Sequence, residues 1–183
     1  MENQKINIKT VAETIGHSLF IGAYADSEHI LKEIDKTQKL QPNETRLGNL
    51  FDEMLHFYLN LTDRFAFQYL GEKRGEFFDE VSIQVFKNYL DGHKLAGGKV
   101  DDETLYRIFN EAHKKRQEEY GSYKFTTEKE EGMKGNLFYE FESRLAEIFG
   151  AKNDPLIIMF IHAVLVPNVG KFHELCKKIM SEI

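Results

Sequence analysis

Residues 51–67 read FDEMLHFYLNLTDRFAF and decide the fold, because apolar and polar side chains alternate there with the period of a helix. On a wheel of about 100° per residue, the polar side chains share one arc of about 120° and the apolar ones fill the remainder. A helix that is apolar over so wide an arc touches neighbours on most sides. We therefore expect it near the centre of a helical bundle. The polar arc contains Glu53, His56, Asn60, Asp63 and Arg64, which we call the polar strip, with Asp52 at its edge.

The same spacing of three and four residues recurs on both sides of this stretch, and strand-like alternation is nearly absent. The sequence therefore predicts an all-α, single-domain helical bundle, residues 1–183, of about six to seven helices. A break is expected in the first segment between Gly22 and Ser27. The expected helical segments are roughly 8–38, 44–70, 73–91, 101–120, 136–149, 154–166 and 168–182.

Several residues mark the ends of these segments. Gly71 is well placed to end the 44–70 helix, and Asp101 or Asp102 can cap the helix that runs to about residue 120. Asp154-Pro155 is a strong helix start, whereas Pro167 should end or kink the same helix. Residues 121–135 show no sustained period and form the stretch long enough to act as a lid.

Composition and charge exclude some classes of function. The chain has 183 residues and a formal net charge of −6, which argues against nucleic-acid binding. Its longest apolar run, residues 156–166, is shorter than the roughly 20 residues of a membrane span, so we expect a buried core helix with His162 inside it. The N-terminal residues lack the apolar stretch of a secretory signal. We expect a cytoplasmic protein that binds neither nucleic acid nor membrane.

The polar strip allows three interpretations: a solvated helix face, a buried network of hydrogen bonds, or a functional pocket. The strip contains no Lys, the usual residue of a solvated face. As a pocket it offers Glu53, His56, Asp63 and Arg64 as candidate catalytic residues. His56 would act as a base oriented by Asp63, and Arg64 would bind an anionic group.

Glu53 and His56 also form a Glu-x-x-His motif, whose spacing lets both side chains reach one metal ion from one helix. Ferritin-like di-iron bundles use two such motifs and a Glu from each of two further helices. This chain has one motif, and its other six His residues supply no second. We therefore predict no metal and no cofactor. Cys176 is the one cysteine, which excludes an intramolecular disulfide.

The leading functional hypothesis is a helical-bundle protein that acts by binding, either to itself as a homodimer or to another protein. It rests on the lack of a complete catalytic motif and on the surplus of apolar residues, including 15 Phe. The alternative is an enzyme, or a bundle that binds a small ligand or metal, using Glu53, His56 and Asp63. The sequence leaves open whether the chain is an enzyme.

Overall fold

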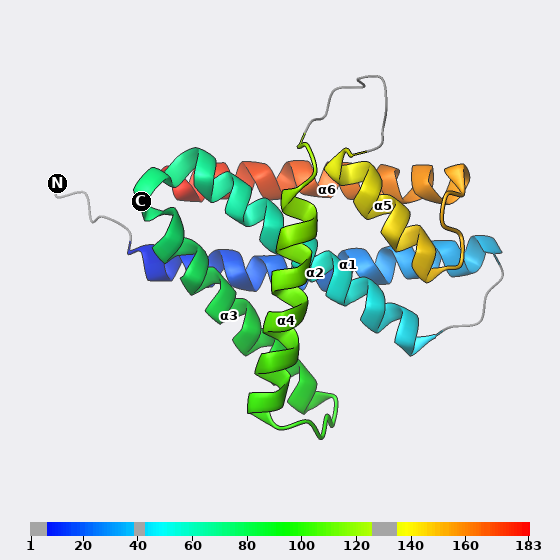
Figure 1. The fold of residues 1–183 in the computed structure, drawn as a ribbon, viewed down its shortest axis with the longest axis horizontal. Helices are drawn as coiled ribbons and strands as arrows, with labels where there is room; N and C mark the ends of the chain where they lie inside the picture. The colour runs from blue at the N-terminus through cyan, green and yellow to red at the C-terminus, as the bar shows by residue number, and fades with distance from the viewer. Residues whose placement is uncertain (1–6, 39–42, 126–134) are drawn as a thin grey trace.

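The computed structural model describes residues 7–38, 43–125 and 135–183, and within them it confirms the all-α class (Figure 1). Six α-helices and one short 3-10 turn follow one another along the chain. In order they are α1 (Ile8–Gln38), α2 (Glu44–Leu70), η1 (Gly71–Lys73), α3 (Arg74–Leu95), α4 (Asp102–Gly121), α5 (Leu137–Ile148) and α6 (Pro155–Met180).

The described residues form fewer uninterrupted helical segments than the six to seven helices predicted, because expected breaks are absent. α1 continues through Gly22, and α6 continues through Pro167. In addition, η1 joins α2 to α3 directly, so the described residues form five uninterrupted helical segments rather than six to seven. Packing on both sides of each weak point holds these helices together, which overrides the local preference of Gly and Pro.

The predicted helix caps are confirmed. Asp101 accepts a hydrogen bond from the Thr104 backbone N–H at 2.9 Å, and Asp154 accepts one from Leu156 at the same distance. Each carboxylate thereby satisfies a backbone donor that the first helical turn leaves free. Gly71 ends α2 with a φ of +54°, a conformation that favours glycine.

α2 lies at the centre of the bundle, as the width of its apolar arc predicts. Its residues 54–62 are all buried, which is nine consecutive positions and therefore every side of the helix. α1, α3, α4, α5 and α6 all contact it. α3 and α4 form a hairpin that projects beyond the other helices (Figure 1).

α1 packs against α3 at a glycine. A Cβ at Gly16 would lie 3.0 Å from the Cβ of Gln84 and 3.2 Å from the carbonyl oxygen of Val81. The two helices therefore approach closely because residue 16 has no side chain. Gly22, on the same helix, has open space around it.

α6 runs opposite to α1 (Figure 1) and buries one side only. Among the described helices, α6 has a length and composition compatible with crossing a membrane, a test that a core helix of a soluble protein also passes. The apolar run of residues 156–166 is too short to span a membrane, but the helix that contains it continues for fourteen residues beyond it. His162, expected in the core, has a side chain that is 56% exposed.

The predicted lid segment, residues 121–135, is described only at its ends. Lys124 and Asn136 form an isolated parallel bridge, in which the Lys124 N–H donates to the Gly135 carbonyl at 2.9 Å. Residues 126–134, and with them the question of a lid, lie outside the described residues.

Candidate functional site

The polar strip lies on α2 and is called the α2 strip from here on. Its C-terminal part faces α4 rather than solvent. The Asn60 side-chain amide donates to Gln117 at 2.7 Å. The Arg64 guanidinium donates to the carbonyl oxygens of Tyr120 at 2.7 Å and Tyr123 at 3.1 Å, where α4 ends. Arg64 therefore satisfies carbonyls that a helix C-terminus leaves free, and it is not available to bind an anion.

Asp63 is likewise committed to a structural contact. Its carboxylate accepts two hydrogen bonds from the Arg74 guanidinium, at 2.8 and 2.6 Å. This two-point pairing joins α2 to the first turn of α3 across η1. The structure thus separates Asp63 from the role of orienting His56.

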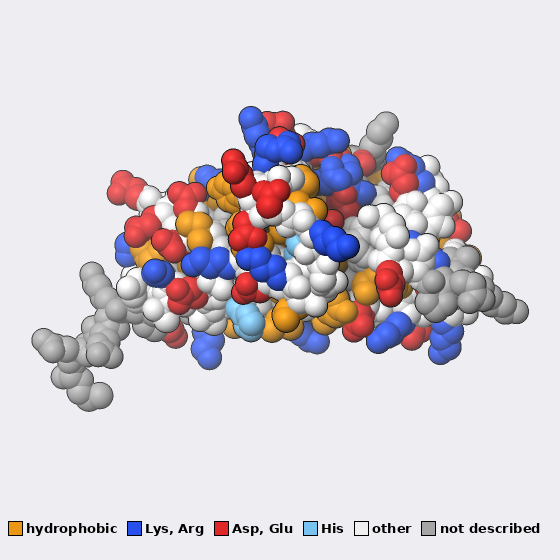
Figure 2. Space-filling model, turned by 90° about the horizontal axis from the view of Figure 1, so that it is seen from below, with side chains coloured by type: hydrophobic (Ala, Val, Ile, Leu, Met, Phe, Trp, Pro, Cys, Tyr) orange, Lys and Arg blue, Asp and Glu red, His pale blue; other side chains and the backbone are white. Residues whose placement is uncertain are grey.

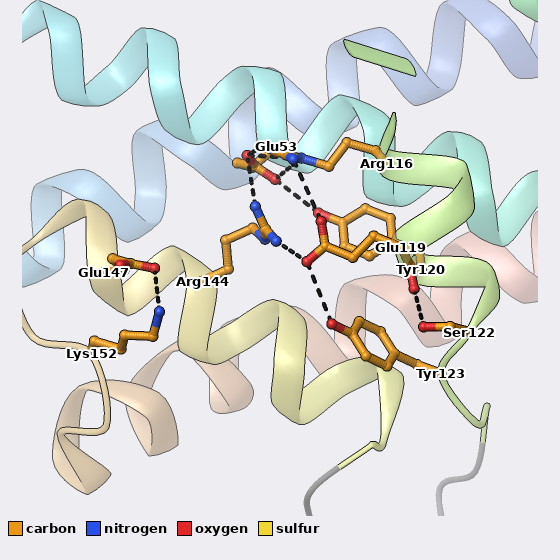
Figure 3. A network of polar contacts seen from close by, with 9 residues as sticks. All are labelled: Glu53, Arg116, Glu119, Tyr120, Ser122, Tyr123, Arg144, Glu147 and Lys152. Atoms are coloured by element: carbon orange, nitrogen blue, oxygen red, sulfur yellow. Dashed lines mark hydrogen bonds and ion pairs between the residues drawn. The ribbon is translucent and has the colours of Figure 1, made fainter. Parts of the chain in front are cut away.

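Glu53 lies in a network of ion pairs that joins three helices (Figure 3). Its carboxylate accepts hydrogen bonds from the Arg116 guanidinium and, at 2.8 Å, from the Tyr120 hydroxyl, both on α4. Arg144 of α5 lies 3.8 Å away and also pairs with Glu119. Because the Glu53 side chain is only 13% exposed, these contacts replace the water that the charge would otherwise need.

A pocket of about 420 Å³ begins beside this network, between α2, α3, α4 and α5. Two residues of the α2 strip, Glu53 and His56, line it. The other three members of the strip, Asn60, Asp63 and Arg64, are not among its lining residues. The pocket is lined by Asn49, Asp52, Glu53, His56, Tyr89, Ile108, Phe109, Ala112, Arg116, Arg144, Glu147 and Ile148.

His56 is the unusual residue of the pocket. It is 5% exposed, and its Nδ1 atom is buried with no hydrogen-bond partner among the described residues. Burial, helped by the neighbouring His113 and Arg116, lowers the pKa of His56 to about 3. The imidazole is therefore neutral at pH 7, with one donor and one acceptor nitrogen. Its ring packs against Phe109 and His113, with centroids 5.4 and 5.7 Å away.

Asp52 lines the pocket one turn before His56. Burial raises the pKa of Asp52 to about 6, although a hydrogen bond from the Tyr89 hydroxyl at 3.3 Å lowers it. Tyr89 in turn lies between Phe51 and Phe109 in a continuous line of aromatic rings. The pocket therefore places a carboxyl group and a neutral imidazole beside flat apolar surfaces.

The geometry does not bring together a metal site from the Glu-x-x-His motif. The Glu53 carboxylate is already bound by Arg116, Arg144 and Tyr120. Among the described residues, no group of three His, Cys, Asp or Glu side chains is arranged to hold a metal ion.

Sequence reasoning missed the residues that other helices bring to the pocket. Tyr89, Phe109, Arg116 and Arg144 come from α3, α4 and α5, and nothing in their local spacing marks them as neighbours of His56. Asp52 carries a signal, because it lies at the edge of the polar arc of α2. Comparison with known protein families, with curated proteins and with solved structures finds no match for this chain.

Asp26 and Glu142 are buried carboxyl groups that lie outside the pocket. Asp26 of α1 accepts hydrogen bonds from the Tyr58 hydroxyl at 2.6 Å and from Asn168 at 2.8 Å, which joins α1, α2 and α6. Glu142 of α5, 3% exposed, pairs with His162 Nδ1 at 2.7 Å. Both groups have their partners within the fold. On the face seen in Figure 2, acidic and basic side chains are interspersed, with small apolar patches between them.

Proposed function

We propose that this chain binds a small, flat organic molecule in the pocket between α2, α3, α4 and α5, with His56 and Asp52 as the polar contacts. The observation that carries the proposal is the buried, unpartnered Nδ1 atom of His56. The proposal takes up the small-ligand form of the alternative hypothesis and replaces Asp63 with Asp52. Self-association would use a surface other than this pocket. A cytoplasmic location remains a prediction.

The unpartnered Nδ1 atom of His56 lowers the stability of the folded chain. A buried donor or acceptor without a partner costs about 1–3 kcal/mol. Several other buried side-chain atoms of the described residues lack partners, among them His113 Nδ1 and Gln117 Nε2, but of these residues His56 is the one that lines the pocket. A ligand that hydrogen-bonds to His56 recovers this free energy.

The walls of the pocket indicate the shape of the ligand. Phe109 and Ala112 of α4 and Ile148 of α5 supply apolar surface, and flat rings pack well on such walls. Arg116 and Arg144 lie at the same pocket but are occupied by Glu53 and Glu119, which leaves them little capacity for an anion. The ligand therefore needs no strong negative charge.

The polar groups indicate the chemistry of its edge. Asp52 offers carboxylate oxygens that accept hydrogen bonds, and Tyr89 occupies one of them. An amino-substituted nitrogen heterocycle presents adjacent ring and amino nitrogens along one edge. When its ring nitrogen is protonated, such an edge donates two parallel hydrogen bonds to a carboxylate, and the second amino N–H remains to donate to the acceptor nitrogen of His56. We therefore choose 2-aminopyridine as the probe and pyridine, which lacks the amino group, as its control.

Saturation-transfer NMR tests the proposal directly. We expect 2-aminopyridine to receive saturation from the protein with a dissociation constant of about 1 mM, typical of so small a probe. Pyridine should bind more weakly, because it cannot donate to Asp52. Equal signals for the two probes would contradict the proposed recognition.

Two variants locate the binding. Ala112→Phe fills the pocket from the α4 side and should abolish the signal. His56→Phe keeps a flat ring but removes the nitrogens, so it should abolish binding while the free energy of unfolding changes by no more than about 1 kcal/mol. A loss of several kcal/mol in His56→Phe, with no probe bound by the wild-type chain, would make His56 a structural residue.

A further inference from the structure

We infer that the outward face of α6 is a dimer interface, on which a second copy of the chain packs its own α6 in the antiparallel direction. This inference does not depend on the pocket, since none of the pocket-lining residues lies on α6.

The exposed apolar residues of α6 lie on one side of the helix. Leu156 is 75% exposed, Met159 67% and Val166 37%. With Ala163, Pro167 and Gly170, which are also exposed, they fill an arc of about 100° on a helical wheel. From residue 156 to residue 170 this face, the α6 stripe, is roughly 21 Å long and contains no charged side chain. Contiguous exposed apolar surface of this kind typically marks an interaction site.

The sizes of the side chains suit an antiparallel copy. Large residues lie toward the N-terminal end of the stripe, and small ones lie at its centre and C-terminal end. If Ala163 faces Ala163 of the second copy on a twofold axis, Leu156 lies opposite Gly170 and Met159 lies opposite Pro167. A large side chain then meets a smaller one at both of these pairs. A twofold axis also makes the contact close on itself, as most dimers require.

Charge beyond the stripe favours the same direction. The C-terminal part of α6 carries three exposed lysines, Lys171, Lys177 and Lys178, and one exposed carboxylate, Glu174, so this part of the helix is positive on balance. In an antiparallel pair these lysines lie over the N-terminal end of the other α6, near Asp154, which caps the helix, and near the exposed Glu147, which also pairs with Lys152 of its own copy. In a parallel pair each lysine would instead lie beside the same lysine of the second chain, and the two positive charges would repel each other. Charge therefore selects the antiparallel arrangement.

Sedimentation velocity of the full chain between about 1 and 200 μM tests the interface, since a contact this small gives affinities in the micromolar range. We expect conversion from monomer to dimer across this range. Met159→Lys should shift the midpoint upward at least tenfold. Ile83→Lys, a matched substitution of an exposed residue on α3, should leave it unchanged.

Cross-linking with a short bismaleimide tests the direction. Ala163→Cys should cross-link to itself, because the two copies of residue 163 meet at the axis. Leu156→Cys and Gly170→Cys should each fail alone and cross-link when mixed. The wild-type chain is the control, because Cys176 is fully buried and burial raises its thiol pKa to about 12.

Three results would overturn the inference. A monomer at every concentration removes the dimer, and self-linking of Gly170→Cys removes the antiparallel arrangement. If the monomeric chain instead binds vesicles of phosphatidylcholine and phosphatidylserine, and Met159→Lys abolishes that binding, the stripe faces a membrane surface.

Discussion

The two parts of the α2 strip differ in how many partners their polar groups have. Glu53, Asp63 and Arg64 each pair with residues of another element, through distances that satisfy ordinary hydrogen bonds or ion pairs. His56, on the same face, is more deeply buried than Glu53 and Asp63 and has no partner for Nδ1. Other buried side chains of the described residues also lack a partner, so this alone does not mark a binding residue. His56 differs from them because it also lines the pocket.

The largest loss of stability should come from breaking the contacts of Glu53, which belongs to the part of the α2 strip whose polar groups all have partners. Glu53→Ala removes one of the two carboxylates that Arg116 and Arg144 share, inside a partly dehydrated site, and leaves them Glu119. Removing one member of a buried ion pair costs about 3–5 kcal/mol. Because Glu119 remains, we expect a loss at the lower end of this range, about 3 kcal/mol, in the free energy of unfolding, measured by urea denaturation.

Two controls define this prediction. Glu111→Ala removes an exposed pair with Arg107 and should cost less than about 0.5 kcal/mol. The double variant Glu53→Leu with Arg116→Leu should be more stable than Glu53→Ala, because no buried charge is left alone. If Glu53→Ala unfolds like the wild-type chain, the network is not structural and Glu53 returns as a candidate for the pocket.

The sequence predicted the positions of the helices better than the contacts between them. The helical period at residues 44–70 placed α2 correctly, and the width of its apolar arc predicted its central position. Caps at Asp101 and Asp154 followed from local hydrogen bonding alone. These features depend on neighbours within a few residues along the chain, which is why one sequence is sufficient to predict them.

The partners of the strip could not be predicted in the same way. Arg116 meets Glu53 across 63 positions in the sequence, and Arg64 meets Tyr120 across 56. The turns between helices set such contacts, and no local period records them. Pro167 shows the same limit, because the buried Leu165 and Val169 on either side keep the helix intact.

Glu142 lies between the two extremes, since it is buried with one side-chain partner, His162. Burial raises its pKa from an ordinary value of 4.5 to about 7, although the hydrogen bond and charge of His162 lower it. A raised folded-state pKa stabilises the fold below pH 4.5, and this stabilisation is lost as the pH rises through 7. The wild-type chain should lose about 3 kcal/mol of this contribution between pH 4.5 and 8.

Glu142→Gln should remove this part of the pH dependence, so that the variant gains on the wild-type chain as the pH rises. Urea denaturation at several pH values measures the difference. Glu118→Gln, on the exposed side of α4, should follow the wild-type curve. Parallel curves for wild type and Glu142→Gln would show that Glu142 is hydrated in the native state.

The smallest expected effect is a shift in the titration of Asp52, and it tests the pocket most directly. Because burial raises the pKa of Asp52 to about 6, its carboxyl carbon should titrate near pH 6 in ¹³C NMR spectra. Asp101 serves as a reference in the same spectra, since backbone hydrogen bonds from the first turn of α4 hold its pKa below the usual range. The two aspartates should therefore move in opposite directions from 3.8.

Two changes should shift the Asp52 midpoint in opposite directions. Tyr89→Phe removes a donor that favours the ionised form, so the midpoint should rise by a fraction of a pH unit. Saturating 2-aminopyridine adds donors and should lower it. A midpoint near that of an exposed aspartate, unmoved by the probe, would mean that water already solvates Asp52. The pocket would then be an ordinary surface hollow, and the unpartnered His56 alone would not be sufficient evidence for a ligand.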